Sequence, residues 1–452
     1  MIAKFSFAKN ASAPLIFALC GALAAGCTGD TDDGDDDGAD TGGSDDNPTT
    51  TNMPTTNTPD TGTADGMDDP DTDTGGSDDM MGTTVSVDDT AGSSTGTPTA
   101  CEVTPKAWDA PDWEANTVEA LAVRAQLDAI AGGSGIMRLA EQGGDEVQEL
   151  ADLTAAWEAG DPSLADVVNP GYSPIVDGAF DEFLDVLAAG PLSLIDSDNM
   201  WLPGAEGGIW GMSDRAINEG GLELRQLIDK GGFGPGAMYA YALGLTEGDL
   251  EPATFDAIAA AWGNNATLDP DDKKNGLTDA AGYSHSMGFH ADMVTALTDA
   301  KAYSADAECD AERDAAVQTF FQLWEQTLMA RAVFYGNRAE GKLLAAASDS
   351  DFADVLHDLA EGIGVAAGFT GLPDPAAGPL MGAGRTITDA DLDMIIASFG
   401  VDPADLGNST TGLFVESLPN LEIAVGEVEG VVMDVYEVDE ATIMGYADPT
   451  PG

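Results

Sequence analysis

The sequence predicts an all-α fold, on three observations. From Cys101 onward, apolar residues recur every three or four positions, which is the period of an amphipathic helix. Gly and Pro interrupt these periodic stretches often, so the helices should be separate rods joined by loops. Short, alternating β-branched stretches occur only in the tail, from Phe414 to Val438. We therefore expect about ten helices in one or two bundles, with at most a short β hairpin near the C-terminus.

The helices can be placed in order along the chain. The first covers residues 118–130, with an apolar face that is closed by Gly132 and Gly133. A second covers 145–159, and a third has apolar residues at i, i+3, i+4 and i+7 starting from Phe180. Further helices are expected at 213–230, 234–245, 251–262, 278–298, 311–346, 351–370 and 388–399.

The charge balance excludes one class of function. The chain of 452 residues carries 81 Asp and Glu against 16 Lys and Arg, a formal charge of −65. Nucleic-acid binding through a basic patch needs clustered Lys and Arg, so nucleic acid is not an expected partner. Adhesion to anionic lipid headgroups is disfavoured for the same reason.

Residues 1–26 have the features of a secretion signal. Lys4 and Lys9 give a positive start, and the apolar run 13–25 is short for a membrane span. The run ends in LAAGC, which resembles a bacterial lipobox, so we expect cleavage before Cys27 and lipidation of its thiol. Acyl chains there would anchor the protein, and the residue after Cys27 is typical of outer-membrane lipoproteins. The alternative is ordinary cleavage after a small residue, which would release a soluble protein.

An acidic linker, residues 27–100, separates the signal from the helical domain at 101–452. After Cys27 it contains 19 Asp but no Glu, Lys or Arg, among Thr, Gly, Ser, Pro and Asn. Such a segment cannot bury a core and repels itself, so we expect an extended, disordered stalk. The functional alternative is weak capture of divalent cations by runs of Asp, although none has the spacing of an EF-hand loop.

Two cysteines remain once the signal is removed and Cys27 is acylated. In an oxidising compartment we expect Cys101 and Cys309 to form a disulfide between the start and the middle of the helical domain. The chain-entropy model assigns about 4–5 kcal/mol to so long a loop. The alternative is two unrelated thiols.

Three blocks in the helical domain resemble a known family. They are GLELRQLIDKGGFG at 221–234, HDLAEGIG at 357–364 and ITDADLDMI at 387–395. In this order they resemble an uncharacterised group of bacterial lipoproteins (domain of unknown function 4856), over about residues 112–400. That family is similar in architecture to imelysin-type helical proteins.

The resemblance implies an envelope-anchored helical protein, with neighbours of its kind associated with iron or haem acquisition. It implies no established activity. The family often has a His-His-Trp-Asp-Glu-Ala segment where this chain has NGLTDA at 275–280, so any metal ligands among those histidines are missing here. The nearby His285 and His290 are candidates to replace them. The imelysin signature GxHxxE is also absent.

The chain has three histidines, and His357 is the best candidate ligand. His357 and Glu361 are four residues apart, which places both on one helix face about 6 Å apart. Such a pair suits iron or zinc, with His285 or His290 completing the site and Asp279 or Glu325 as further carboxylates. The alternative is a structural histidine, whose imidazole donates a hydrogen bond to a carboxylate inside a helix bundle and binds no metal.

His285 and His290 are five residues apart, or about 140° around a helix, so one ion would need an irregular helix to reach both. Two interpretations also remain for the glycines beside these groups, Gly282, Gly288, Gly362 and Gly364. They either let backbone approach a ligand or allow tight helix packing.

No other catalytic motif stands out. HEXXH, a P-loop and a dinucleotide fingerprint are missing, and the helical domain at 101–452 contains no G-x-S-x-G elbow. The leading interpretation is therefore a non-enzymatic envelope lipoprotein, a helical module on an acidic stalk that binds a ligand or an envelope protein partner, in iron or haem uptake. A metal-dependent hydrolase of imelysin-like architecture is the first alternative, and a structural or interaction protein is the second.

Overall fold

The computed structural model describes most of the predicted helical domain. The signal, Cys27, the acidic linker and the helix expected at 145–159 lie outside the described residues. All described residues belong to one compact unit of the chain. They are 101–131, 135–142, 174–189, 207–210, 215–270, 279–372 and 385–449.

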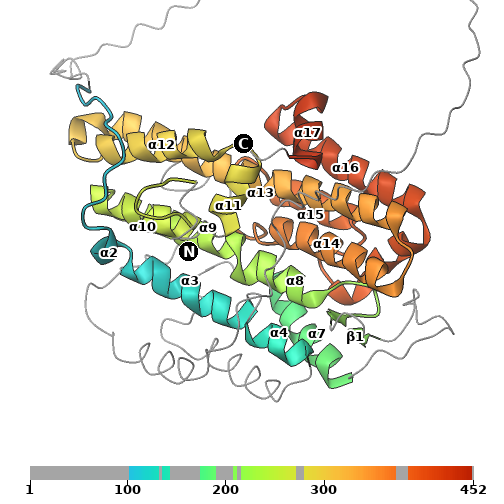
Figure 1. Ribbon diagram of the computed structural model, residues 1–452. Coiled ribbons are helices and arrows are strands. Elements are labelled where there is room, and N and C mark those ends of the chain that lie inside the picture. Colours follow the sequence, from blue (N-terminus) through green and yellow to red (C-terminus); the bar gives the residue numbers. More distant parts are fainter. Residues whose placement is uncertain are drawn as a thin grey trace, which may run out of the picture. The chain divides into compact units, whose positions relative to one another are not determined.

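The described residues are mostly helical, which confirms the predicted fold class (Figure 1). They also contain a two-stranded antiparallel sheet, in which β1 (Gly208–Trp210) pairs with β2 (Arg215–Ile217). The α-helices are α2 (Trp113–Asn116), α3 (Val118–Ala131), α4 (Ile136–Glu141), α7 (Pro174–Ala189), α8 (Leu224–Ile228), α9 (Pro235–Leu245), α10 (Pro252–Trp262), α11 (Asp279–Ser286), α12 (His290–Tyr303), α13 (Asp310–Ala345), α14 (Asp349–Ala367), α15 (Asp389–Ser398), α16 (Leu418–Tyr436) and α17 (Glu440–Ala447). Shorter helical turns are η1 (Asp229–Phe233), η3 (Ala307–Cys309), η4 (Leu406–Asn408) and η5 (Thr411–Glu416).

The long helix α13 is the axis of the fold. Helices α12, α14, α16 and α17 all pack against it (Figure 1). Although α13 has 36 residues, no helix in the described part of the chain is long and apolar enough to cross a membrane. By packing on α14, α13 fixes the helix that carries His357 and Glu361.

An aromatic core lies where α9, α10 and α13 meet. Tyr239 of α9 packs against Phe321 and Trp324, with ring centroids 5.3 and 5.4 Å away. These edge-to-face contacts add about 0.5–1.5 kcal/mol each to the effect of burial. We define the aromatic core as Tyr239, Trp262, Phe320, Phe321, Trp324 and Phe369, all fully buried.

The helix expected at 213–230 is wrong in its first half. Residues of β2 extend to Ile217, and helical structure begins only at Leu224, from which α8 continues into the π-type turn η1. Gly221 has a φ of +85°, a left-handed conformation that glycine adopts without strain and that separates strand from helix. A positive φ cannot be recognised from hydrophobic spacing, so the pattern missed this turn.

The helix expected at 278–298 is also interrupted. Helix α11 ends at Ser286 and α12 begins at His290. Gly288 between them has a φ of +83°, which breaks the helical path. The chain therefore changes direction between His285 and His290.

The strands expected between Phe414 and Val438 are wrong. This stretch forms η5 and α16, so the small hairpin of the molecule lies at β1 and β2 and not near the C-terminus. The β-branched residues that favoured strands have a helical spacing as well, and packing of that face against α13 and α15 overrides their strand propensity. The buried face of α16 consists of Leu421, Ala424, Val425, Val428 and Val432.

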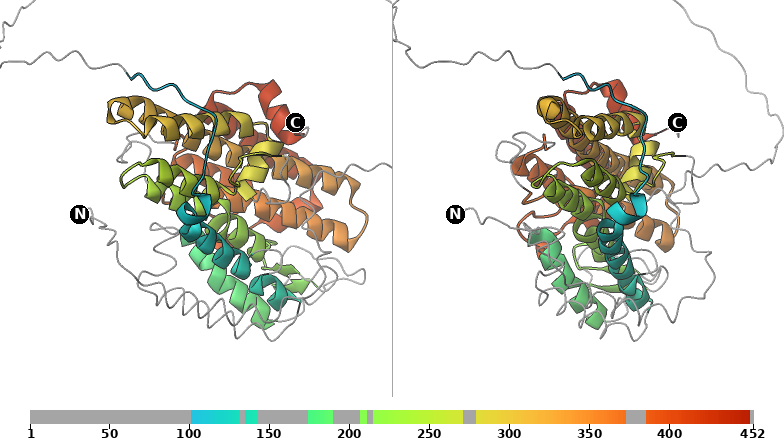
Figure 2. Two further views of the ribbon diagram at one scale, coloured as in Figure 1. Left: turned by 60° about the vertical axis from the view of Figure 1, so that its left-hand side comes forward. Right: turned by 90° about the vertical axis from the view of Figure 1, so that its left-hand side faces the viewer.

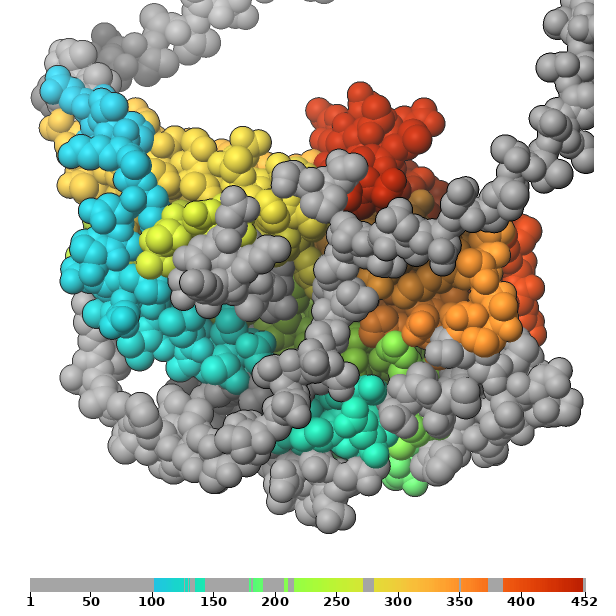
Figure 3. Space-filling view, in the orientation of Figure 1, coloured from blue at the N-terminus to red at the C-terminus, as the bar shows by residue number. Residues whose placement is uncertain are grey.

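The predicted disulfide between Cys101 and Cys309 is present, with Cα atoms 4.9 Å apart. It fastens residues 101–112, which we call the strap, to the turn before α13. The strap runs over α12 toward α2 (Figures 2 and 3). The indole Nε1 of Trp108 donates to the carbonyl oxygen of Ala266 at 3.0 Å, which holds the middle of the strap against the domain.

Candidate metal centre

Two of the three sequence blocks lie against each other. Residues 221–234 form α8 and η1, and both pack on α14, which contains residues 357–364. The blocks come closest at Gly364, where an added Cβ would lie 2.9 Å from Lys230 Cβ and 3.0 Å from the carbonyl oxygen of Gln226. Of the two interpretations of the glycines, helix packing therefore holds at Gly364. This close approach brings the polar side chains of the two blocks together.

His357 is oriented by Glu223. Its Nδ1 lies 3.0 Å from Glu223 Oε2, and the guanidinium of Arg215 contacts the same nitrogen. Burial alone would raise the pKa of Glu223, but Arg215 and His357 outweigh it and hold this pKa well below its usual range. An ionised carboxylate can only accept and a guanidinium can only donate, so the tautomer of His357 decides which of these two contacts at Nδ1 is a hydrogen bond. In the tautomer that donates from Nδ1 to Glu223, Nε2 keeps its lone pair. Metal-binding histidines are commonly oriented by a carboxylate in this way.

Glu361 faces that second nitrogen. Its Oε1 lies 3.8 Å from His357 Nε2, and 3.4 Å from the ammonium of Lys230. Its Oε2 is buried and has no hydrogen-bond partner among the described residues. Asp358 adds a third donor, since one ligand atom from each of His357, Asp358 and Glu361 lies within 4.8 Å of the others. An imidazole with two carboxylates is a donor set that suits zinc and iron.

Paired charges surround this group. Arg215 lies 3.0 Å from Glu223 and 3.0 Å from Asp354, and Arg225 lies 2.9 Å from Glu141. Lys342 of α13 approaches Asp358 at 2.9 Å. We define the charge layer as Glu141, Arg215, Glu223, Arg225, Lys230, Lys342, Asp358 and Glu361.

The pKa values of three groups in the charge layer are raised, for different reasons. It raises the pKa of Glu141 to about 7, against the opposing effect of Arg225, and it raises the pKa of Asp358. Burial alone would lower the pKa of Lys230, but nearby Tyr283, Tyr335 and Glu361 outweigh it, and the pKa lies well above the usual value. Lys230 is therefore an ammonium at neutral pH, and any metal ion at Glu361 must compete with it.

The other two predicted ligands form a separate pair. The break before α12 places the rings of His285 and His290 with centroids 6.0 Å apart. Asn264 Nδ2 donates to His290 Nε2 at 3.0 Å, and the His290 ring stacks on Trp262. Burial, followed by the effect of His285, lowers the pKa of His290 to about 4. Neither histidine belongs to the group within 4.8 Å around His357.

Glu325, considered above as a further metal ligand, instead accepts hydrogen bonds from other parts of the chain. It accepts the backbone N–H groups of Thr386 and Ile387, each at 2.8 Å, and the hydroxyl of Tyr436 at 2.7 Å. It therefore fixes the third sequence block, which starts at Ile387. Asp279 is the first residue of α11, and its side chain lies outside the part of the chain that the structure describes.

Sequence reasoning missed Glu223 as the partner of His357. The available signal was in block 221–234, where Glu223, Arg225 and Lys230 interrupt a run of buried apolar residues. Charges inside an apolar run need partners when the run is buried. The pattern does not say which residues supply those partners.

Fold and site together define an all-α protein with a buried layer of paired charges around a histidine–glutamate pair. Comparison with known proteins finds no family model, no curated protein and no solved structure that matches the chain. The resemblance to the lipoprotein family therefore stays a prediction.

Proposed function

We propose that this protein is an envelope lipoprotein whose helical domain binds a transition-metal ion through His357, Glu361 and Asp358, in the service of iron uptake. One observation carries the proposal: His357 Nε2 faces Glu361, whose buried Oε2 lacks a hydrogen-bond partner among the described residues. Glu223 contacts Nδ1 on the opposite edge of the imidazole and so orients the ring. Ligand chemistry fits iron and zinc, and the family resemblance favours iron.

Metal content of the purified full chain tests this proposal. We expect stoichiometric iron or zinc after incubation and desalting, and a loss of at least about tenfold in affinity in His357→Ala and Glu361→Gln. His285→Ala is the matched control, because it removes a histidine outside the group, and it should bind like the parent chain. A parent chain without bound metal, or an equal loss in His285→Ala, would contradict the assignment.

A structural role is the second candidate, and the position of Lys230 favours it. The ammonium lies 3.4 Å from Glu361, so the carboxylate already has a cation. Lys230→Met distinguishes the two functions, since it removes the competitor and keeps the length of the side chain. A metal site predicts tighter metal binding in this variant and stabilisation by added metal. A purely structural layer predicts loss of stability that metal does not restore.

The proposed anchor needs its own experiment. A lipidated Cys27 should incorporate radiolabelled fatty acid in a bacterial host and place the chain in the membrane fraction. Cys27→Ser should abolish the label. A label-free parent chain that is released after cleavage would support the soluble alternative instead.

A further inference from the structure

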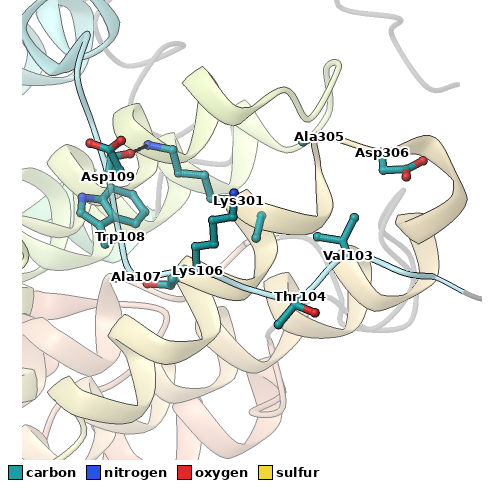
Figure 4. A pocket seen from close by; sticks show the side chains of 11 residues that line it. Val103, Thr104, Lys106, Ala107, Trp108, Asp109, Lys301, Ala305 and Asp306 are labelled. Atoms are coloured by element: carbon teal, nitrogen blue, oxygen red, sulfur yellow. Dashed lines mark hydrogen bonds between the residues drawn. The ribbon is translucent and has the colours of Figure 1, made fainter.

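A pocket lies between the strap and the C-terminal half of α12, and it shares no residue with the charge layer. Its volume is about 380 Å³, and its walls come from strap residues 103–109 and from α12 with the turn after it (Figure 4). This volume lies at the lower end of the range for small-molecule sites. Sequence analysis gave no function to these residues.

The wall of the pocket is fixed by Trp108 and Lys301. Trp108 is held through its indole nitrogen, and the ammonium of Lys301 lies 4.2 Å from the centroid of its ring. Lys301 in turn donates to Asp256 at 2.5 Å and to the carbonyl oxygen of Asp109 at 2.6 Å. The small side chains of Ala302 and its neighbours leave space beside this wall. Because these groups are already paired, the wall should need little reorganisation to accept a ligand.

Within the residues that the structure describes, Lys106 is the charged group of the pocket whose ammonium is free to bind a ligand. Its side chain extends from the strap toward α12, beside Lys301 (Figure 4). The other lysines in the described part of the chain, Lys230, Lys301 and Lys342, each have a carboxylate partner. Among those same described residues, Lys106 has no hydrogen bond or ion pair. Lys106 is exposed, so its ammonium is accessible to a ligand that enters the pocket.

We propose that this pocket binds a small organic monocarboxylate, with Lys106 as the anchoring cation and Trp108 as the apolar wall. A charged hydrogen bond to the ammonium supplies orientation, and the indole and alanine surfaces supply apolar contact. Asp109 and Asp306 also line the pocket and repel anions in proportion to their charge, so a ligand with one negative charge is favoured over one with two or more. The pocket size fits a ligand of about ten non-hydrogen atoms.

The experiment compares benzoate with benzamidine, which has similar shape and opposite charge, on the full chain by ligand-observed NMR. We expect saturable binding of benzoate, an affinity loss of about tenfold in Lys106→Ala, and retention in Lys106→Arg. Arg313→Ala is the control, because it removes the same charge from a residue that does not line the pocket. Circular dichroism of each variant confirms that it is folded.

Three results would overturn the proposal. They are binding of benzamidine at least as tight as that of benzoate, absence of saturable benzoate binding, and an equal loss in Lys106→Ala and Arg313→Ala. None of them bears on the metal site, since the pocket shares no residue with the charge layer.

Discussion

The charge layer and the aromatic core are both buried against α13 or α14, yet they stabilise the fold differently. The aromatic core is held by apolar contacts between rings, which tolerate a change of shape when volume is nearly kept. The charge layer is held by partners that cannot be replaced singly, because removing one leaves a buried charge uncompensated. The comparison shows that, among the described residues, the charge layer pairs buried cations with buried carboxylates, whereas the aromatic core consists of uncharged rings. It predicts unequal responses to mutation in the two regions.

The largest difference should appear between Glu223→Ala and Phe321→Leu. Glu223→Ala removes the fully buried carboxylate of Arg215, which keeps only the partly exposed Asp354, and should lower the free energy of unfolding by about 3–5 kcal/mol. Phe321→Leu keeps an apolar side chain in the aromatic core and should cost less than about 1.5 kcal/mol. Urea denaturation of both variants measures the two losses. A larger loss in Phe321→Leu would remove the basis of the comparison.

A pH effect comes next, with one carboxyl group at each region. Burial raises the pKa of Glu141 in the charge layer, and of Glu325 beside the aromatic core, to about 7 in each case. When the pKa of a carboxyl group is higher in the folded than in the unfolded protein, its contribution to stability is fully present below the pKa of the unfolded state. This contribution is lost as the pH rises through the folded-state pKa of about 7. We therefore expect the free energy of unfolding to fall between about pH 4.5 and pH 7, by about 3 kcal/mol for each group.

Thermal melts across this pH range measure the effect, and glutamine variants assign it. Glu325→Gln should remove its share of the slope while Glu141 keeps its own, and Glu141→Gln should do the reverse. An unchanged slope in both variants would show that neither group has the raised pKa.

A smaller effect should follow from closing the gap between α8 and α14. In Gly364→Ala the new methyl group would meet Lys230 and the backbone of Gln226, with an expected loss of about 1–3 kcal/mol. Gly341→Ala in α13 is the control, because nothing lies within 4 Å of an added Cβ, and helix propensity should make it neutral or stabilising. Equal losses in the two variants would mean that the close approach at Gly364 does not matter for stability.

The smallest effect should be the same at two helix starts, one on a helix of the charge layer and one outside both regions. Ser348 caps the N-terminus of α14 and Thr388 that of α15, each with a capping box in which the cap side chain accepts the N–H of Asp351 or Asp391. Ser348→Ala and Thr388→Ala should each cost about 1 kcal/mol, because capping is local and does not depend on the region behind the helix. Losses that differ by more than a factor of three in urea denaturation would contradict this.

Much of the fold was predictable because its information is local. The helical period placed α3, α9, α10 and α13 within a few residues of their ends, and the acidic turn after Thr388 marked the start of α15. The disulfide followed from the number of cysteines left in the mature chain. The turn at Gly288 was missed because it depends on a positive φ, which the spacing of apolar residues does not reveal. The helix at 418–436 was missed because packing decides between helix and strand there.

The candidate site was predictable only in part. The four-residue spacing brought His357 and Glu361 together as expected, since both lie on α14. Glu223 lies 134 residues from His357 in the sequence, and only the packing of α8 on α14 joins them. His285 and His290 come close to each other through the break at Gly288. His290 is hydrogen-bonded to Asn264, and neither histidine joins His357 as the sequence had suggested.

Anomalous X-ray diffraction from crystals of the metal-soaked protein tests the central claim most directly. Data collected on both sides of the iron and zinc absorption edges should give one strong peak between His357 Nε2 and the Glu361 carboxylate. A peak at His285 and His290, or Lys230 still bound to Glu361 with no peak beside it, would contradict the account.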